Sequence, residues 1–337
     1  MTIREQMQKM ERENLSPYAC LSVNSRGRDR EEPECDIRPV FQRDRDRILH
    51  SKSFRRLKNK TQVFLTPKGD HYRTRLSHTL EVSQNARTIA KALKLNEDLV
   101  EAIALGHDLG HTPFGHAGER LLNSVYKGGF KHNEQSVRIV EKLEKDGRGL
   151  NLTWEVRDGI LNHQTSTTPH TLEGKIVRLS DKIAYVNSDF DDAIRAQMLS
   201  EDSIPLEIRK TLGFDTRSRL NCLIHDIIIH SMGQDDIRMS AECSEAFMDL
   251  RAFMFANVYN NPIAKGEEAR AESMLGQLYQ YYMEHPEILS EKFLKMYDAG
   301  EDLGRVVCDF ISGMTDQFAI YRFNEFYLPK AWQVDGF

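Results

Sequence analysis

Histidines are crowded into one part of this chain of 337 residues. A neutral imidazole is the commonest nitrogen ligand for a transition metal in proteins. Such a concentration therefore favours a metal-dependent reaction over a purely structural role. Six of the twelve histidines fall between residues 71 and 132: His71, His78, His107, His111, His116 and His132.

The pair His107-Asp108 stands at the end of an apolar segment, in the string ALGHDLGH. Neighbouring side chains on a regular helix do not face each other, so both can reach one ion only at a helix end or a local irregularity. A metal site needs further ligands from other helices, and the candidates are His78 in RLSHTLEV and Asp181 in IVRLSDKIAY. Four ligands of this kind leave room on the ion for water or phosphate, as hydrolysis requires.

Two further groups of polar side chains have helical spacing. His116 and Glu119 are three residues apart just after a proline, where a new helix is expected to begin, so they share a helix face. In that arrangement the carboxylate can orient the imidazole and raise its basicity for proton transfer. Asp181, Tyr185 and Asp189 step by four along one helix face and would line one wall of a groove.

Helices make up nearly all of the regular structure that the sequence predicts. Apolar residues recur at three- and four-residue spacing, and strand signals are sparse apart from a short one at 61–65. The expected fold class is all-α, with a polar arm over 1–50 that is poorly ordered or wraps a partner, a core over 51–200, and a helical region over 201–337 that packs with the core. Helical segments are expected near 45–57, 75–93, 99–104, 176–184, 206–229, 243–259, 269–283 and 303–321.

Composition and motifs exclude several classes of protein. The formal net charge of −5 excludes a uniformly basic nucleic-acid binder, although not a local basic face. No apolar run reaches the length of about 18 residues that a membrane span needs, and the charged start is unlike a secretory signal. Five scattered cysteines favour reduced thiols in a cytoplasmic protein. The GxxxxGK[ST], HExxH and GxSxG motifs are absent.

Several strings together resemble the HD phosphohydrolase superfamily, and more narrowly its dNTP triphosphohydrolases. They are RDRDRILHSKSFRRLKNKTQVF, HYRTRLSHTLEV, GHDLGHTPFGHAGE, HNEQS and DKIAYVNSD, and they cover roughly residues 40 to 200. The resemblance implies an HD-domain helical bundle with additional C-terminal helices. It also implies one divalent cation, Mg²⁺ or Mn²⁺ before other transition metals, held in the order H…HD…D. The matching ligands in this chain are His78, His107, Asp108 and Asp181.

The resemblance also implies roles around the metal. It implies that Lys182 holds phosphate, that Tyr185 packs under the sugar, and that Asp189 binds the 3′-hydroxyl. The matching catalytic residues are His116, Glu119, His111 and His132. The matching substrate-binding residues are Gln62, Arg56, Arg75, Lys182, Tyr185 and Asp189.

The implied reaction is hydrolysis of a deoxynucleoside triphosphate at the α-phosphorus, which releases a deoxynucleoside and tripolyphosphate. A tyrosine ring beneath C2′ would leave no room for a 2′-hydroxyl, so ribonucleotides would be rejected. The resemblance further implies a homo-oligomer, a tetramer or hexamer, that is regulated by bound dNTP or single-stranded DNA. The sequence does not indicate which base is preferred.

Two alternatives stay open at this point. One is a related HD enzyme, such as a 5′-deoxynucleotidase that acts on monophosphates. The other is a nucleotide-sensing or single-strand-binding protein with a vestigial site, in which the basic run 43–60 holds an effector or a nucleic-acid backbone. The product distinguishes the two enzymes, because only the first releases tripolyphosphate.

Overall fold

The computed structural model describes residues 1–62 and 72–329, except the side chains of 262–265. Within these ranges it contains only helices and two isolated bridges, so the predicted all-α class is confirmed. His71 lies outside the described residues. The α-helices are α1 Ile3–Asn14, α2 Val40–Leu49, α3 Lys52–Arg56, α4 Arg75–Leu93, α5 Glu97–Gly106, α6 Gly115–Val125, α7 His132–Arg138, α8 Trp154–Leu161, α9 Leu172–Arg195, α10 Leu206–Leu212, α11 Thr216–Ser231, α12 Ala241–Met254, α13 Pro262–Glu284, α14 Glu291–Asp298, α15 Leu303–Ser312 and α16 Asp316–Tyr327. Shorter turns are the 3₁₀ segments η1 Ser22–Asn24, η2 Leu57–Asn59, η4 Glu201–Ser203 and η6 Pro286–Ile288, and the π-helical segments η3 Ile139–Leu143 and η5 Phe255–Tyr259.

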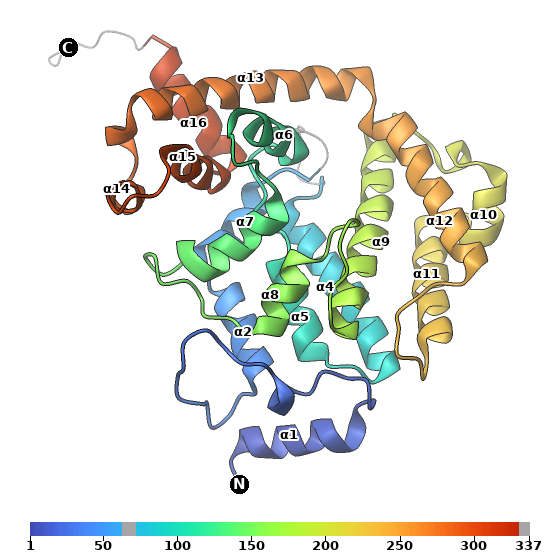
Figure 1. The fold of residues 1–337 in the computed structure, drawn as a ribbon. Coiled ribbons are helices and arrows are strands. Elements are labelled where there is room, and N and C mark those ends of the chain that lie inside the picture. Colours follow the sequence, from blue (N-terminus) through green and yellow to red (C-terminus); the bar gives the residue numbers. More distant parts are fainter. Residues whose placement is uncertain (63–71, 330–337) are drawn as a thin grey trace, which may run out of the picture.

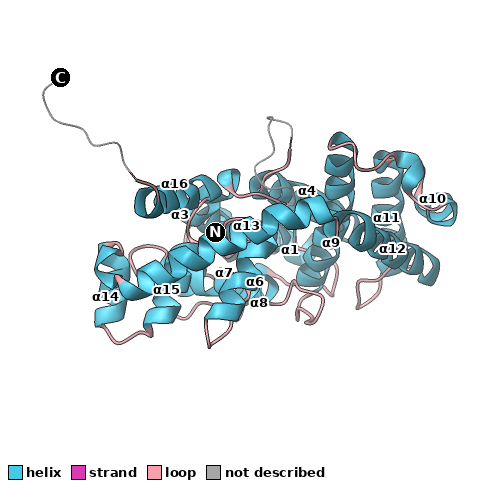
Figure 2. Ribbon diagram, turned by 90° about the horizontal axis from the view of Figure 1, so that it is seen from above, coloured by secondary structure: helices cyan, strands magenta, loops and turns pink. Residues whose placement is uncertain are grey.

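The helices enclose two apolar clusters. The larger cluster is built mainly by α2, α4, α5, α8 and α9, with α10 to α12 packed at one side (Figure 1). The smaller cluster is built by α6, α13, α15 and α16. Figure 2 shows α13 crossing one face of the molecule, with α14 to α16 at one side and α10 to α12 at the other. The long α13 therefore links the two ends of the C-terminal part.

The pair α4 and α9 forms the centre of the larger cluster. Buried positions of α4 recur every three or four residues, at Val82, Ala86, Ile89 and Leu93, as expected for a helix that packs along one face. The threonine before α4 accepts a hydrogen bond from the backbone of Ser77, which satisfies a free amide at the helix start. Both helices also pack against α5, so side chains from three helices can meet.

The N-terminal arm differs from the sequence-based expectation, because it is ordered against the core. Phe41 and Ile48 of α2 are fully buried in the larger cluster. The guanidinium of Arg28 donates to the buried carboxylate of Asp44 and to the carbonyl of Val40 at 3.1 Å. The arm is therefore ordered, because its charges pair with one another over separations that no local sequence pattern reveals. That it also wraps a partner stays a prediction.

Three predicted helices are each broken in two. The segment 45–57 is interrupted at His50 and Ser51, where the serine hydroxyl accepts the amide of Phe54 at 3.1 Å and starts α3. The segment 206–229 is interrupted at Gly213, whose φ of +119° lies outside helical backbone. The segment 303–321 is interrupted between α15 and α16.

Of the short strand predicted at 61–65, only Thr61 and Gln62 are described, and Thr61 forms an isolated bridge with Thr74. None of the described helices combines the length and the apolar character needed to cross a bilayer.

Candidate active site

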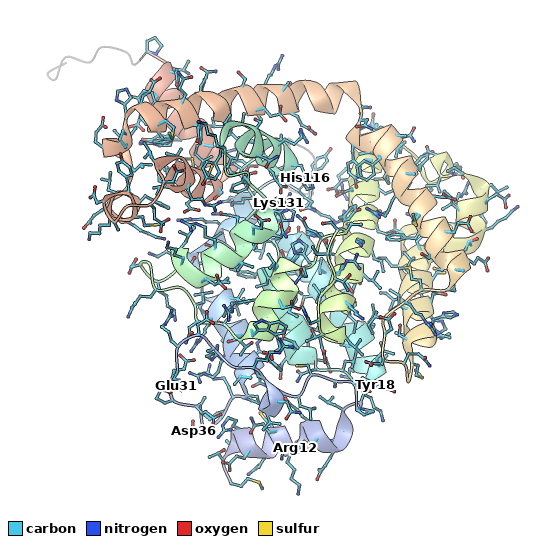
Figure 3. All side chains as sticks on the ribbon, viewed as in Figure 1. Arg12, Tyr18, Glu31, Asp36, His116 and Lys131 are labelled. Atoms are coloured by element: carbon cyan, nitrogen blue, oxygen red, sulfur yellow. The ribbon has the colours of Figure 1, made fainter. Side chains whose placement is uncertain are left out.

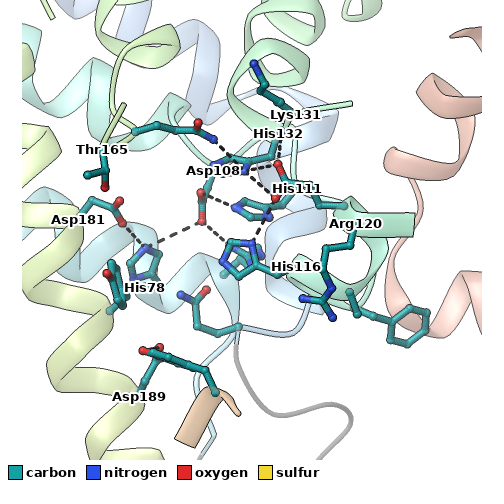
Figure 4. A pocket seen from close by; sticks show the side chains of 18 of the residues that line it. His78, Asp108, His111, His116, Arg120, Lys131, His132, Thr165, Asp181 and Asp189 are labelled. Carbon is teal, nitrogen blue, oxygen red and sulfur yellow. Dashed lines mark hydrogen bonds and ion pairs between the residues drawn. The ribbon is translucent and has the colours of Figure 1, made fainter. Parts of the chain in front are cut away.

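A cavity of about 820 Å³ is lined by side chains from α4, α6, α7, α9 and η5 and from the loops around them. Figure 4 shows the cluster of imidazoles and carboxylates on its wall (Figure 4). Among the labelled side chains of Figure 3, His116 and Lys131 lie close to α6, at the end of the molecule opposite α1 (Figure 3). All the predicted site residues line the cavity except His107, which lies behind its wall, and Arg56.

Three helices bring the four predicted metal ligands together. The donor atoms of His78, His107 and Asp108 lie within 4.8 Å of one another. Asp181 Oδ1 is 3.0 Å from Nε2 of His78 and 3.7 Å from Nε2 of His107. His78 lies on α4, His107 and Asp108 at the end of α5, and Asp181 on α9. The dipeptide can supply two ligands because α5 ends there, as the spacing argument requires.

The protonation pattern of His107 fits a cation. Its Nδ1 lies 2.7 Å from the carbonyl oxygen of Ala104, which can only accept, so the proton stays on Nδ1. Its Nε2 is buried and has no hydrogen-bond partner. Although burial opposes it, the carboxylates of Asp108 and Asp181 raise the pKa of His107 to about 9. The donor set therefore attracts positive charge at the position where a divalent metal would bind.

Arg75 and His111 both contact the ligand Asp108. The guanidinium of Arg75 donates to Asp108 Oδ2 at 2.8 Å, and its Nε is buried without a partner. His111 Nε2 is 3.2 Å from Asp108 Oδ1. Burial would raise the pKa of Asp108, but the adjacent imidazoles and Arg75 hold it well below its usual range. The carboxylate thus stays ionised and available to a cation.

Glu119 connects two of the predicted catalytic histidines. Its Oε2 is 3.2 Å from Nδ1 of His116, and its Oε1 is 2.9 Å from Nδ1 of His132. It also accepts the backbone amide of His132 at 2.8 Å. Burial would raise the pKa of Glu119, but these imidazoles lower it, so it stays a carboxylate. The ring of His111 stacks on His132 with centroids 3.9 Å apart.

One histidine of this cluster was missed by the sequence analysis. His163 is buried, and its Nε2 is 3.1 Å from Nε2 of His132. Its Nδ1 is 2.7 Å from the carbonyl of Ile160, so that nitrogen carries the proton and Nε2 is left as an acceptor. Burial and the cationic neighbours lower the pKa of His163 to about 4. No motif around it in ILNHQTS could have indicated this position.

The far side of the cavity holds Tyr185 and Asp189 of α9. The hydroxyl of Tyr185 accepts a hydrogen bond from Nε of Arg251 at 2.9 Å, and Asp189 Oδ2 accepts one from the hydroxyl of Tyr259 at 2.7 Å. Asp189 Oδ1 and Gln62 Oε1 are buried without a partner, so both are free to accept a hydrogen bond. Arg251 and Tyr259 were also missed, because they stand in α12 and η5 with no spacing that links them to the motifs.

Of the three predicted phosphate-binding cations, Arg75 and Lys182 line the cavity and Arg56 does not. Burial lowers the pKa of Lys182 to about 8, with a contribution from Arg178 and Arg251. The positive charges of Lys182, Arg178 and Arg251 would attract an anionic ligand. Arg56, by contrast, does not line the cavity, and its guanidinium lies beside Gly313 instead.

Comparison with known proteins identifies two family regions in the chain. Residues 75–186 match the HD domain, and residues 237–325 match the phosphohydrolase-associated domain. A deoxyguanosinetriphosphate triphosphohydrolase-like protein from Caldanaerobacter subterraneus is 54% identical, over 98% of each chain. One with the same name from Clostridium perfringens is 49% identical, over 98% of this chain and 99% of that protein.

The fold is similar to that of a solved phosphohydrolase from Bacteroides thetaiotaomicron, with a TM-score of 0.50 and 18% identity. That match covers 82% of this chain and 66% of the other. The extent of identity to the curated relatives, over nearly the whole chain, shows the family. The chain belongs to the HD-domain phosphohydrolases of the deoxyguanosinetriphosphate triphosphohydrolase-like family, and its buried histidine and aspartate cluster is a candidate site for a divalent metal ion.

Proposed function

We propose that this protein hydrolyses deoxynucleoside triphosphates at the α-phosphorus to a deoxynucleoside and tripolyphosphate. The observation that supports this most directly is the content of one cavity. It holds a cluster that fits a divalent cation, cationic side chains at Arg75 and Lys182, and a separate wall at Tyr185 and Asp189. A volume of about 820 Å³ is within the usual range of ligand sites. The relatives' name points to the same substrate class.

In the proposed reaction a water oxygen forms a bond to the α-phosphorus while the bond from phosphorus to O5′ breaks. The water gives up a proton, and O5′ takes one up to become the 5′-hydroxyl. A divalent cation held by the four ligands would polarise the α-phosphate. Arg75 and Lys182 would offset the negative charge that increases in the transition state.

Proton transfer is assigned to His116, and His132 shares the carboxylate of Glu119 with it. The carboxylate orients both rings through their Nδ1 atoms, 3.2 Å and 2.9 Å away. His116 is mostly exposed to the cavity side, with 67% of its side chain accessible, so its Nε2 is free to exchange a proton with substrate. His111 and His163 keep His132 in place by stacking and by the imidazole contact.

Sugar recognition is assigned to the far wall. The unpaired oxygens of Asp189 and Gln62 would accept the 3′-hydroxyl, and the ring of Tyr185 would exclude a 2′-hydroxyl. Assembly as a tetramer or hexamer, with regulation by bound dNTP or single-stranded DNA, is proposed with this reaction.

The test is product analysis with each dNTP, singly and mixed, in Mg²⁺ or Mn²⁺. Phosphorus NMR should detect tripolyphosphate, and chromatography should detect an equal amount of deoxynucleoside. Lys182→Ala should weaken turnover, whereas Lys175→Ala, on the same helix but paired with Asp236 at 2.8 Å, should not. Orthophosphate released from dNMP alone would favour the monophosphatase alternative, and tight dNTP binding without any product would favour a sensor.

A further inference from the structure

The turn that joins α15 to α16 contacts the loop that precedes α6. Asp316, the first residue of α16, is 4% exposed. Its Oδ1 accepts the backbone amide of Phe114 at 3.0 Å. Its Oδ2 accepts the backbone amide of Thr61 at 2.9 Å and also the hydroxyl of the same threonine. One carboxylate thus holds two segments that are far apart in the sequence.

The amide of Phe114 belongs to an unusual backbone. Phe114 has φ +60° and Gly115 has φ +56°, so two consecutive residues adopt the left-handed region. A bulky side chain rarely adopts that region unless its surroundings hold it there. His116 follows directly in the first turn of α6, and Glu119 lies one turn further along the helix. The direction of that turn therefore depends on what holds the loop.

A second contact ties the same parts together. Lys60 is fully buried, and its Nζ donates to the carbonyl of Ser312 at 2.7 Å and to the carbonyl of His111. Lys60 and Asp316 bind the loop 111–115 from its two ends. The neighbour of Thr61 is Gln62, which lines the cavity. Asp316 thus binds Phe114, two residues before His116, and Thr61, beside Gln62. Lys60 connects the end of α15 to the carbonyl of His111.

We propose that Asp316 is a positioning residue for the reaction. By fixing the Phe114 amide it sets the start of α6, so that His116 and Glu119 lie at the phosphates. The turn between α15 and α16 then supports the active site without lining its cavity. The assignment rests on the proposed function, because it is there that His116 receives its role.

The test replaces Asp316 by asparagine, which has the same shape but turns one acceptor into a donor. The amide group then faces the N–H of either Phe114 or Thr61. Displacement of a reacting group by about 1 Å can lower a rate a hundredfold, so we expect kcat for dGTP to fall about tenfold to a hundredfold. KM and metal content should change by less than about threefold, because the metal ligands lie on other segments.

A matched control separates positioning from general loss of stability. Asp44 in α2 is also buried and also accepts the amide and hydroxyl of one threonine, Thr153, at 2.8 and 2.7 Å. It does not line the cavity. Asp44→Asn, which also weakens the ion pair with Arg28, should lower the melting temperature at least as much but leave kcat unchanged. Asp316→Glu, which retains both acceptors one methylene further out, should lose less activity than Asp316→Asn and replaces it if that variant does not fold.

Hydrogen exchange gives a readout that does not need turnover. The amides of residues 111, 112 and 114–118 should lose protection in the Asp316 variant but not in the Asp44 variant. If the wild type hydrolyses no dNTP, the proposed function fails, and the exchange result alone decides whether Asp316 holds the loop. Two results would overturn the inference. One is that these amides are as well protected in the Asp316 variant as in the wild type, and the other is that the folded Asp316 variant has the same kcat as the Asp44 variant.

Discussion

Replacement of Asp189 by asparagine should change the stability of this protein in a pH-dependent way. Burial raises the pKa of Asp189 from 3.8 to about 7, although the Tyr259 hydroxyl opposes the shift. The folded protein therefore keeps this proton until about pH 7, whereas the unfolded chain releases it near pH 4. Stability from this group is present below about pH 4, is lost as pH rises to about 7, and changes no further above that.

The magnitude follows from the width of that interval. One pKa unit corresponds to about 1.4 kcal/mol, so the two units between pH 5 and pH 7 lower the wild-type free energy of unfolding by about 3 kcal/mol. Asparagine has no proton to release. Its amide leaves N–H groups unpaired where Oδ1 now lies, at a pH-independent cost of about 1 to 3 kcal/mol. The free energy of unfolding of Asp189→Asn minus that of the wild type should thus be about 3 kcal/mol larger at pH 8 than at pH 5.

The assay is urea unfolding of the metal-free protein at both pH values, followed by circular dichroism. Asp298→Asn, at an exposed position at the end of α14, serves as the control. Its free energy of unfolding should equal that of the wild type at pH 5 and at pH 8. If the difference in free energy of unfolding between Asp189→Asn and the wild type is the same at pH 5 and pH 8, the carboxyl is already ionised in the folded state at pH 5. The same variant should turn over dNTPs poorly, because an amide N–H group in the place of Oδ1 cannot accept a hydrogen bond from the 3′-hydroxyl.

Further predictions concern the metal, the proton transfer, the sugar and the assembly. Asp181→Ala should abolish bound metal in elemental analysis as well as turnover, and full metal occupancy would contradict the ligand set. His116→Ala should keep metal and substrate binding but lose about 10² to 10⁴ in kcat, and a near-wild-type rate would leave that histidine a structural role. The wild type should have a higher kcat/KM for dGTP than for GTP, and Tyr185→Ala should reduce this ratio. Equal kcat/KM for dGTP and GTP on the wild type would contradict the role assigned to the sugar wall. Light scattering of active protein should give the mass of a tetramer or hexamer of the 38.9 kDa chain. A monomeric mass would contradict the predicted assembly.

The sequence predicts the parts of the fold that depend on periodic burial. The segment beginning near residue 75 becomes α4, and the one around Ile176 becomes part of α9. What it does not predict are breaks caused by single residues, such as Gly213, and the order of the N-terminal arm. That order comes from pairing of charges across long separations, such as Arg28 with Asp44, which no local pattern contains.

The same distinction holds for the site. Residues within motifs, such as His78 and Asp108, meet in the structure because their helices pack together. His163 and Tyr259 stand outside any motif and reach the cavity only through tertiary packing, and Arg251 contacts Tyr185 of its wall in the same way, so spacing could not identify them. Arg56 shows the converse, since it lies within a matched string but away from the cavity.

The bond between Asp316 and Phe114 also has a consequence for synthesis of the protein. The two residues are separated by 202 positions, whereas all four candidate metal ligands are complete once Asp181 has been translated. Translation from Asp181 to Asp316 covers 135 residues, and at about 5 to 20 residues per second a ribosome needs about 7 to 27 seconds for it. During this interval the nascent chain contains every metal ligand but not the carboxylate that holds the loop before α6. A message truncated before codon 316 would therefore yield a product that can acquire metal and still lack a correctly placed His116.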